Sequence, residues 1–83
     1  MRPFFVLVML EYGRHKSVLW DDDLSWTMET RKFASSIALK SDEVRKALEF
    51  LHKHKYLSHL DLTYRTCSGT LAARPRRVLE EAS

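Results

Sequence analysis

The sequence contains a single cysteine, Cys67, among its 83 residues. One cysteine cannot form a disulfide within the chain, and it cannot supply the several thiolates of a cysteine-based zinc site. No motif of a nucleophilic enzyme surrounds it, so we expect Cys67 to lie in a turn without a catalytic role. Low cysteine use also favours a reducing compartment, and we predict a cytoplasmic, intracellular protein.

Glycine and proline are scarce, with two residues of each. This composition leaves room for few irregular loops and favours helices joined by short turns. There is no internal repeat, low-complexity segment or linker, so we predict one domain over residues 1–83. A chain of this length has a thin core, and dimerisation through an apolar surface would add to it.

No apolar run is long enough to cross a membrane. The run from Phe4 to Leu10 has seven residues, whereas a bilayer requires roughly 20, and no signal-peptide cleavage site follows it. Pro3 before the run and Gly13 after it favour a helix, and the valine and phenylalanine content leaves a strand as the alternative. The element over 3–13 is apolar on every side, so we predict a homodimer contact. Its residues would be Phe4, Phe5, Leu7 and Val8.

The signatures of catalysis and of ligand binding are also missing. The chain has no glycine-rich phosphate loop and no Ser/His/Asp order, so we do not expect an enzyme. The three consecutive aspartates over 21–23 lack the spacing of a calcium loop, and the histidines lack the spacing of a zinc site. We therefore expect no metal, no cofactor and no small-molecule ligand.

Charge is balanced in total but uneven along the chain. Fourteen basic and eleven acidic residues give a net charge of +3, which is too low for a histone-like protein. Four arginines nevertheless follow residue 64, so one face can be basic despite the modest total.

Helical periodicity is clearest over 41–54. Val44, Ala47, Leu48 and Leu51 recur at i, i+3, i+4 and i+7, and Ser41 precedes them as a candidate N-cap. Asp42 and Glu43 in the first turn would offset the positive end of the helix dipole.

A second helix is predicted over 27–39, with Thr27 as its N-cap. Its apolar stripe would consist of Phe33, Ala34, Ile37 and Ala38. Before it we expect a short strand over 17–20 and a loop over 21–26, in which Asp23 or Ser25 is another candidate cap.

After residue 57 the period changes to two. Leu60, Leu62 and Tyr64 would line the buried face of a strand. Residues 65–69 would then turn the chain, and 70–74 would return as an edge strand before Pro75.

The segment FASSIALKSDEVRKALEFLHKHKYL resembles the core of winged helix-turn-helix domains of the MarR-like and phage or plasmid replication types. The resemblance implies an α+β fold of three helices with a C-terminal β-hairpin wing. The helix-turn-helix would span 27–55 and the wing 57–78. Ala38 and Lys55 depart from the pattern, because glycine is usual at both positions, where a left-handed backbone costs other residues about 1 kcal/mol.

The resemblance further implies a double-stranded DNA-binding protein, with the helix over 41–54 in the major groove and the wing on the backbone. Such a protein would be a homodimeric regulator of transcription or replication, as in phage or plasmid control systems, and would be associated with the nucleoid. The residues nominated for DNA contact are Lys40, Ser41, Arg45, Lys46, Arg31, Lys32, Arg65, Arg74, Arg76 and Arg77.

One alternative function stays open. Asp42 and Glu43 would repel phosphates at the start of the recognition helix, and winged helices also serve as protein-interaction modules. The chain would then be a small phage inhibitor or an adaptor subunit with a protein partner.

Overall fold

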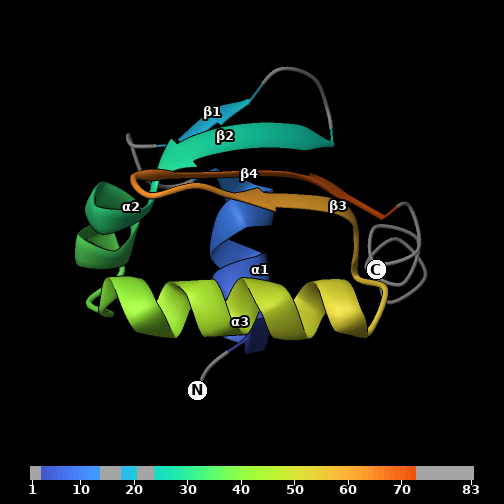
Figure 1. The fold of residues 1–83 in the computed structure, drawn as a ribbon, viewed down its shortest axis with the longest axis horizontal. Coiled ribbons are helices and arrows are strands. Elements are labelled where there is room, and N and C mark those ends of the chain that lie inside the picture. Colours follow the sequence, from blue (N-terminus) through green and yellow to red (C-terminus); the bar gives the residue numbers. More distant parts are fainter. Residues whose placement is uncertain (1–2, 14–17, 21–23, 73–83) are drawn as a thin grey trace.

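The computed structural model describes residues 3–13, 18–20 and 24–72 of the chain. This part is a small α+β structure of three helices and four strands. In chain order the elements are α1 (Pro3–Tyr12), β1 (Val18–Trp20), β2 (Ser25–Glu29), α2 (Thr30–Ser36), α3 (Ser41–Lys53), β3 (Leu57–Leu62) and β4 (Thr66–Leu71). Figure 1 shows the sheet along one side of the molecule and α3 along the other, with α1 crossing behind them.

The four strands form one antiparallel sheet in the order β1-β2-β4-β3. β2 lies between β1 and β4, with Trp26 opposite Gly69 and Met28 opposite Cys67. β3 pairs with β4 at the other edge, with a register shift between Leu57 and His59. The C-terminal hairpin is therefore joined to a strand that lies about forty residues earlier in the chain.

The core confirms the predicted helical stripes. Val44, Ala47, Leu48 and Leu51 of α3 are fully buried, as their spacing predicts. From α2 the core receives three of the four predicted residues, namely Phe33, Ala34 and Ile37, whereas Ala38 is exposed in the turn.

The N-terminal element is a helix, so the helical alternative is confirmed. Gly13 ends it in the left-handed region at φ 57°, and its N–H donates to the carbonyl oxygens of Met9 and Leu10 at 3.1 and 3.2 Å. Only glycine adopts this conformation without a steric cost. The role expected for Gly13 at the helix end is therefore the one it has.

The prediction for residues 21–29 was wrong where the structure describes them. Ser25–Glu29 form β2, and α2 begins at Thr30, so neither Ser25 nor Thr27 is a helix cap. Trp26 and Met28 are buried and alternate with half-buried Ser25 and Thr27, which is the period of a strand. Pairing on both sides, with β1 and β4, overrides the weak local preference. Asp23 and the rest of 21–23 lie outside the described residues.

Two turns contain the residues, Ala38 and Lys55, at which the sequence lacks the glycine that is usual in winged helix-turn-helix domains. Ala38 has φ 59° and Lys55 has φ 67°, so both adopt the conformation that glycine favours. The N–H of Leu39 donates to Ala34 O at 2.8 Å, and that of Tyr56 donates to Leu51 O at 2.8 Å. These bonds close each helix as in a Schellman motif, so the helix ends keep their geometry despite the strained residues.

Two local predictions in the C-terminal half were also wrong. Ser41 is the first residue of α3 rather than its cap, and the Glu43 carboxylate accepts the N–H of Lys40 at 3.1 Å. The hairpin turns at 63–65 instead of 65–69, which places Cys67, Ser68 and Gly69 inside β4.

Gly69 serves a close approach rather than a turn. A Cβ at this position would lie 2.7 Å from His59 O and 2.9 Å from Trp26 Cζ2. The absence of a side chain lets the Trp26 ring pass beneath β4, where it is 1% exposed. This explains why a glycine sits in the middle of a strand.

Candidate nucleic-acid interface

An open hollow of about 540 Å³ lies where α2, the start of α3 and the β3–β4 turn meet. Its lining comes from three separate segments of the chain, namely Glu29, Thr30, Arg31, Lys32, Ser41, Arg45, Tyr64 and Arg65. Five of these residues were nominated from the sequence for DNA contact: Arg31, Lys32, Ser41, Arg45 and Arg65. The fold thus brings about half of the nominated set to one place, which we call the cationic hollow.

The cationic hollow has four basic side chains and one carboxylate. Lys32 Nζ and Glu29 Oε2 form an ion pair at 2.8 Å, and both side chains are more than half exposed. Hydrogen bonding to Glu29 and its charge raise the pKa of Lys32. The N-terminus of α3 also borders the hollow at Ser41, and Asp42 and Glu43 in its first turn offset part of the positive end of its dipole. The surface is therefore suited to an anion.

Arg45 connects α3 with the β3–β4 turn. Its Nη2 donates to the carbonyl oxygens of Thr63 at 2.6 Å and Tyr64 at 2.8 Å. Its side chain is half-buried rather than extended from the helix into solvent. The guanidinium therefore holds the turn against α3, in addition to contributing charge.

The turn itself is held by polar contacts. The Thr63 and Thr66 hydroxyl oxygens are 2.6 Å apart, and the Thr66 N–H donates to Thr63 Oγ1 at 3.0 Å. The Thr30 N–H donates to Arg65 O at 3.1 Å, which fixes the turn to the start of α2. The turn is thus anchored to both α2 and α3.

Tyr64 lies at the tip of this turn and is 91% exposed. The prediction that it would face the core beside Leu60 and Leu62 was wrong, because β3 ends at Leu62 and the alternation ends with it. Sequence reasoning missed Tyr64 as a surface residue. The one local signal was Thr63, whose hydroxyl closes the turn.

The other nominated residues are distributed as follows. Lys40 and Lys46 are exposed, the first just before α3 and the second on it. Arg74, Arg76 and Arg77 lie outside the described residues. Of the two acidic residues that opposed DNA contact, Asp42 is exposed, while Glu43 is engaged at the helix start.

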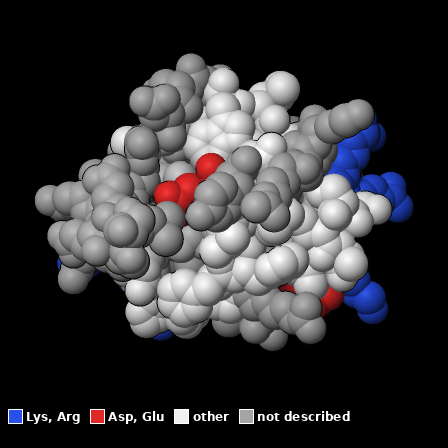
Figure 2. Space-filling model, turned by 180° about the vertical axis from the view of Figure 1, so that it is seen from behind, with Lys and Arg blue, Asp and Glu red and all other residues white. Residues whose placement is uncertain are grey.

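Figure 2 shows the molecule from behind, with lysine and arginine atoms gathered along the right edge. This is the edge at the left of Figure 1, which carries α2 and the beginning of α3. The middle of the same view is mostly uncharged where it is described, apart from a small acidic patch. On this face, most of the described lysine and arginine atoms therefore lie at the end that carries α2 and the beginning of α3.

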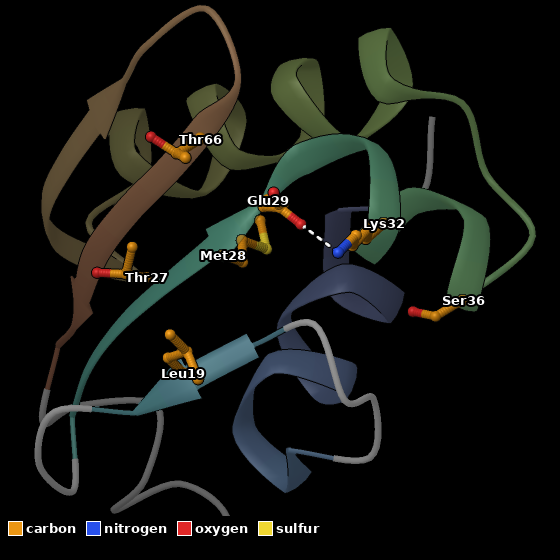
Figure 3. A pocket seen from close by; sticks show the side chains of 7 residues that line it. All are labelled: Leu19, Thr27, Met28, Glu29, Lys32, Ser36 and Thr66. Atoms are coloured by element: carbon orange, nitrogen blue, oxygen red, sulfur yellow. Dashed lines mark ion pairs between the residues drawn. The ribbon is translucent and has the colours of Figure 1, made fainter.

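A second hollow adjoins the first on the outer side of β1 and β2. Figure 3 shows its lining residues, with the ion pair between Glu29 and Lys32 near the middle. Leu19, which is 67% exposed, and Met28 give it an apolar part. The ion pair belongs to both hollows and marks their common border.

Cys67 is buried in β4, with Sγ 2.7 Å from Thr30 Oγ1. Burial raises the pKa of its thiol, because the apolar surroundings disfavour the thiolate. The protonated thiol is a poor nucleophile. Its contact with Thr30 joins β4 to α2 within the core. In the part of the chain that the structure describes, no three His, Cys, Asp or Glu side chains group as metal ligands would.

The predicted dimer face is only partly exposed. Phe4, Phe5 and Val8 are 51, 39 and 42% exposed. Leu7 is 7% exposed and packs into the core, so it does not belong to this face. The reason is helical geometry, since Leu7 points to the same side as the buried Val6 and Leu10.

Near this face, aromatic rings close the far end of α3. Phe4 meets Phe50 edge-on with ring centroids 6.2 Å apart, and meets Tyr56 at 5.3 Å. Phe50 also lies over the His54 ring at 4.2 Å. We call Phe4, Phe50, His54 and Tyr56 the aromatic cluster.

None of the helices over 3–13 and 24–72 combines the length and the apolar composition needed to cross a bilayer. Comparison with known proteins gave no match: no family model fits the chain, and no curated protein or solved structure is significantly similar to it.

Proposed function

We propose that the protein is a small winged helix-turn-helix protein that binds double-stranded DNA. The observation that carries this proposal is the cationic hollow, in which Arg31, Lys32, Arg45 and Arg65 gather from three segments beside the N-terminus of α3. The element order, in which β1 and β2 separate α1 from α2 and the β3–β4 hairpin follows α3, is compatible with such a domain. In this arrangement α3 is the recognition helix, and β3, β4 and their turn are the wing.

The residues divide into three roles in this proposal. Lys46 on the exposed side of α3 faces the major groove, where its ammonium can donate to base edges. Arg31, Lys32 and Arg65 contact phosphates on either side, and each neutralised phosphate releases counterions. Arg45 fixes the wing relative to α3 through its two carbonyl contacts.

A DNA-binding protein of this size would act by occupying a promoter or an origin, as a regulator of transcription or replication in the cytoplasm. A homodimer would present two recognition helices to two half-sites. The exposed side of α1, with Phe4, Phe5 and Val8, is the surface we propose for the second copy. Sedimentation tests this part, and a monomer at high concentration would contradict it.

The central test is fluorescence anisotropy of a labelled duplex at several salt concentrations. We expect micromolar or tighter binding at low salt and a steep loss of affinity as salt rises. Arg31→Ser and Arg65→Ser should each weaken binding on every sequence and lower the salt slope by about one. No binding at micromolar protein in low salt would end the proposal.

Lys53→Ser is the matched control for these variants. Lys53 is an exposed basic residue in the last turn of α3, at the opposite end of the same helix. The Lys53→Ser variant loses the same formal charge as Arg31→Ser, but at a position distant from the cationic hollow. Equal losses from Lys53→Ser and Arg31→Ser would mean that net charge, and not the hollow, carries the binding.

A protein-interaction module is the second candidate, and the exposed apolar side of α1 favours it. Three large side chains are at least 39% exposed on a helix of ten residues, which is typical of a surface that binds another protein. A chain that binds no DNA at low salt but associates through α1 would support this candidate. Loss of that association in a Phe4→Ser and Phe5→Ser double variant would locate the surface.

A further inference from the structure

The tip of the β3–β4 turn presents an aromatic ring to solvent. Tyr64 is 91% exposed, more than any other large apolar or aromatic side chain in the described part of the chain. It lines the cationic hollow together with Arg31, Lys32 and Arg65. The exposed ring therefore lies beside three cationic side chains, of which Lys32 is paired with Glu29.

The backbone beneath Tyr64 is fixed in place. Arg45 donates to the carbonyl oxygen of Tyr64 itself at 2.8 Å, and the hydrogen bonds between Thr63 and Thr66 close the turn. The N–H of Thr30 donates a hydrogen bond to the carbonyl oxygen of Arg65, the residue after Tyr64. The backbone of the turn is thus already ordered without a ligand. Stacking on the Tyr64 ring would therefore cost little further conformational entropy.

Phosphate contacts alone do not require such a ring. The bases inside a continuous duplex are stacked on their neighbours, so they offer no face to a side chain at the backbone. An unpaired base does offer a face, and stacking on an aromatic side chain is favourable for every base type. The phosphate of the same nucleotide would lie within reach of the basic side chains that line the hollow.

We propose that the cationic hollow binds an unpaired nucleotide at a boundary between single-stranded and double-stranded DNA. The base stacks on Tyr64, the phosphate lies among Arg31, Lys32 and Arg65, and the adjoining duplex contacts α3. This inference rests on the proposed DNA binding and specifies its substrate class. It assigns Tyr64 as a specificity-determining residue.

The test uses anisotropy at one fixed salt concentration to measure how tightly the 83-residue chain binds several DNA substrates. The substrates are a blunt duplex, the same duplex with a five-nucleotide overhang of either polarity, and the single strand alone. We expect about tenfold tighter binding to at least one overhang than to the blunt duplex or the single strand. Tyr64→Ala should remove this preference, so that overhanging and blunt duplexes bind equally, whereas Tyr64→Phe should keep it.

A second measurement reports stacking directly. 2-Aminopurine placed at the first unpaired position should lose fluorescence on binding the wild-type chain and not on binding Tyr64→Ala. Circular dichroism checks that the variant is folded, which we expect because the replaced ring is almost fully exposed.

Each outcome has one meaning. Equal affinity for blunt and overhanging duplexes, or a preference that survives Tyr64→Ala, would overturn the inference and leave the proposed DNA binding intact. Single strand bound as tightly as the overhang would also overturn it, because the boundary would then have no role. Failure to bind any of the substrates would instead remove the proposed function.

Discussion

The two ends of α3 differ in what they contact. At its N-terminal end Ser41 and Arg45 border the cationic hollow, and Arg45 binds two carbonyl oxygens of the turn. At its C-terminal end Phe50 and His54 pack in the aromatic cluster with Phe4 and Tyr56. One helix thus joins a polar, charged surface to an apolar one.

Basic residues at the two ends also have different consequences. Lys53 in the last turn lies at the negative end of the helix dipole, so its charge is partly offset there. Arg31, Lys32 and Arg65 lie near the positive end, which Asp42 and Glu43 in the first turn partly offset. That end is better suited to an anionic ligand because four basic side chains from three segments line one hollow there. The C-terminal end is expected to govern stability, and the N-terminal end is expected to govern binding.

The largest expected effect is a loss of stability, without a loss of DNA affinity, at the apolar C-terminal end of α3. Phe50→Ala should lower the free energy of unfolding by about 2 kcal/mol, because it removes a half-buried ring that contacts Phe4 and His54. Urea unfolding followed by tryptophan fluorescence measures this change. The control is Glu49→Ala, at the exposed residue next to Phe50. Its free energy of unfolding should stay within about 0.5 kcal/mol of the wild-type value. A parallel loss of DNA affinity in folded Phe50→Ala would contradict the division between the two ends.

A smaller effect is expected from the contact that orders the polar end. Arg45→Ala removes two hydrogen bonds to the turn and should cost about 1 kcal/mol locally. Chymotrypsin cleavage after Tyr64 should accelerate about fivefold, since cleavage follows local opening. Lys46→Ala removes an exposed neighbouring charge and should leave cleavage unchanged. If Arg45→Ala were cut at the wild-type rate, Arg45 would not hold the β3–β4 turn.

The strained turn at each end of α3 gives a third comparison. Ala38→Gly, before the helix, and Lys55→Gly, after it, should each stabilise the protein by about 0.5–1 kcal/mol, because glycine relieves the positive φ. Lys46→Gly has the opposite sign, since helical φ is retained and glycine costs about 1 kcal/mol there. Thermal unfolding of the three variants would show whether the signs differ as expected.

The smallest effect concerns Cys67, which lies beneath the polar end. Its folded pKa is raised by burial, whereas the unfolded thiol ionises near its ordinary value of about 8.5. Its contribution to stability is therefore fully present below that unfolded pKa and declines as pH rises toward the folded one. Cys67→Ala should show a shallower loss of unfolding free energy above about pH 8.5 than the wild type. Identical slopes would mean that the thiol ionises equally in both states.

The helices were largely predictable, because their buried residues repeat within a few positions of one another. Val44, Ala47, Leu48 and Leu51 carry enough signal to locate α3 without knowledge of the rest of the chain. β2 was not predictable in this way. Its five residues become a strand through pairing with β4, and Trp26 finds its partner Gly69 in a distant segment.

The same distinction applies to the candidate site. Arg31, Lys32, Ser41, Arg45 and Arg65 were nominated individually, and three-dimensional contact places them around one hollow. Tyr64 was missed because the alternating pattern was continued past the end of β3. A turn closed by threonine hydroxyls lacks the glycine or proline that normally marks such a position. The turn was predicted at Ser68 and Gly69 because both residue types are common in turns. Gly69 instead allows close packing inside β4.

β3 lies at one edge of the four-stranded sheet, and edge strands can recruit strands of other molecules. The register shift between Leu57 and His59 interrupts the regular spacing that an incoming strand would need. Asp61, exposed on the same strand, adds a charge that repeats in every copy of the chain. Both features are expected to oppose strand-to-strand aggregation at high concentration, so the β3–β4 hairpin can remain accessible without recruiting strands of other molecules.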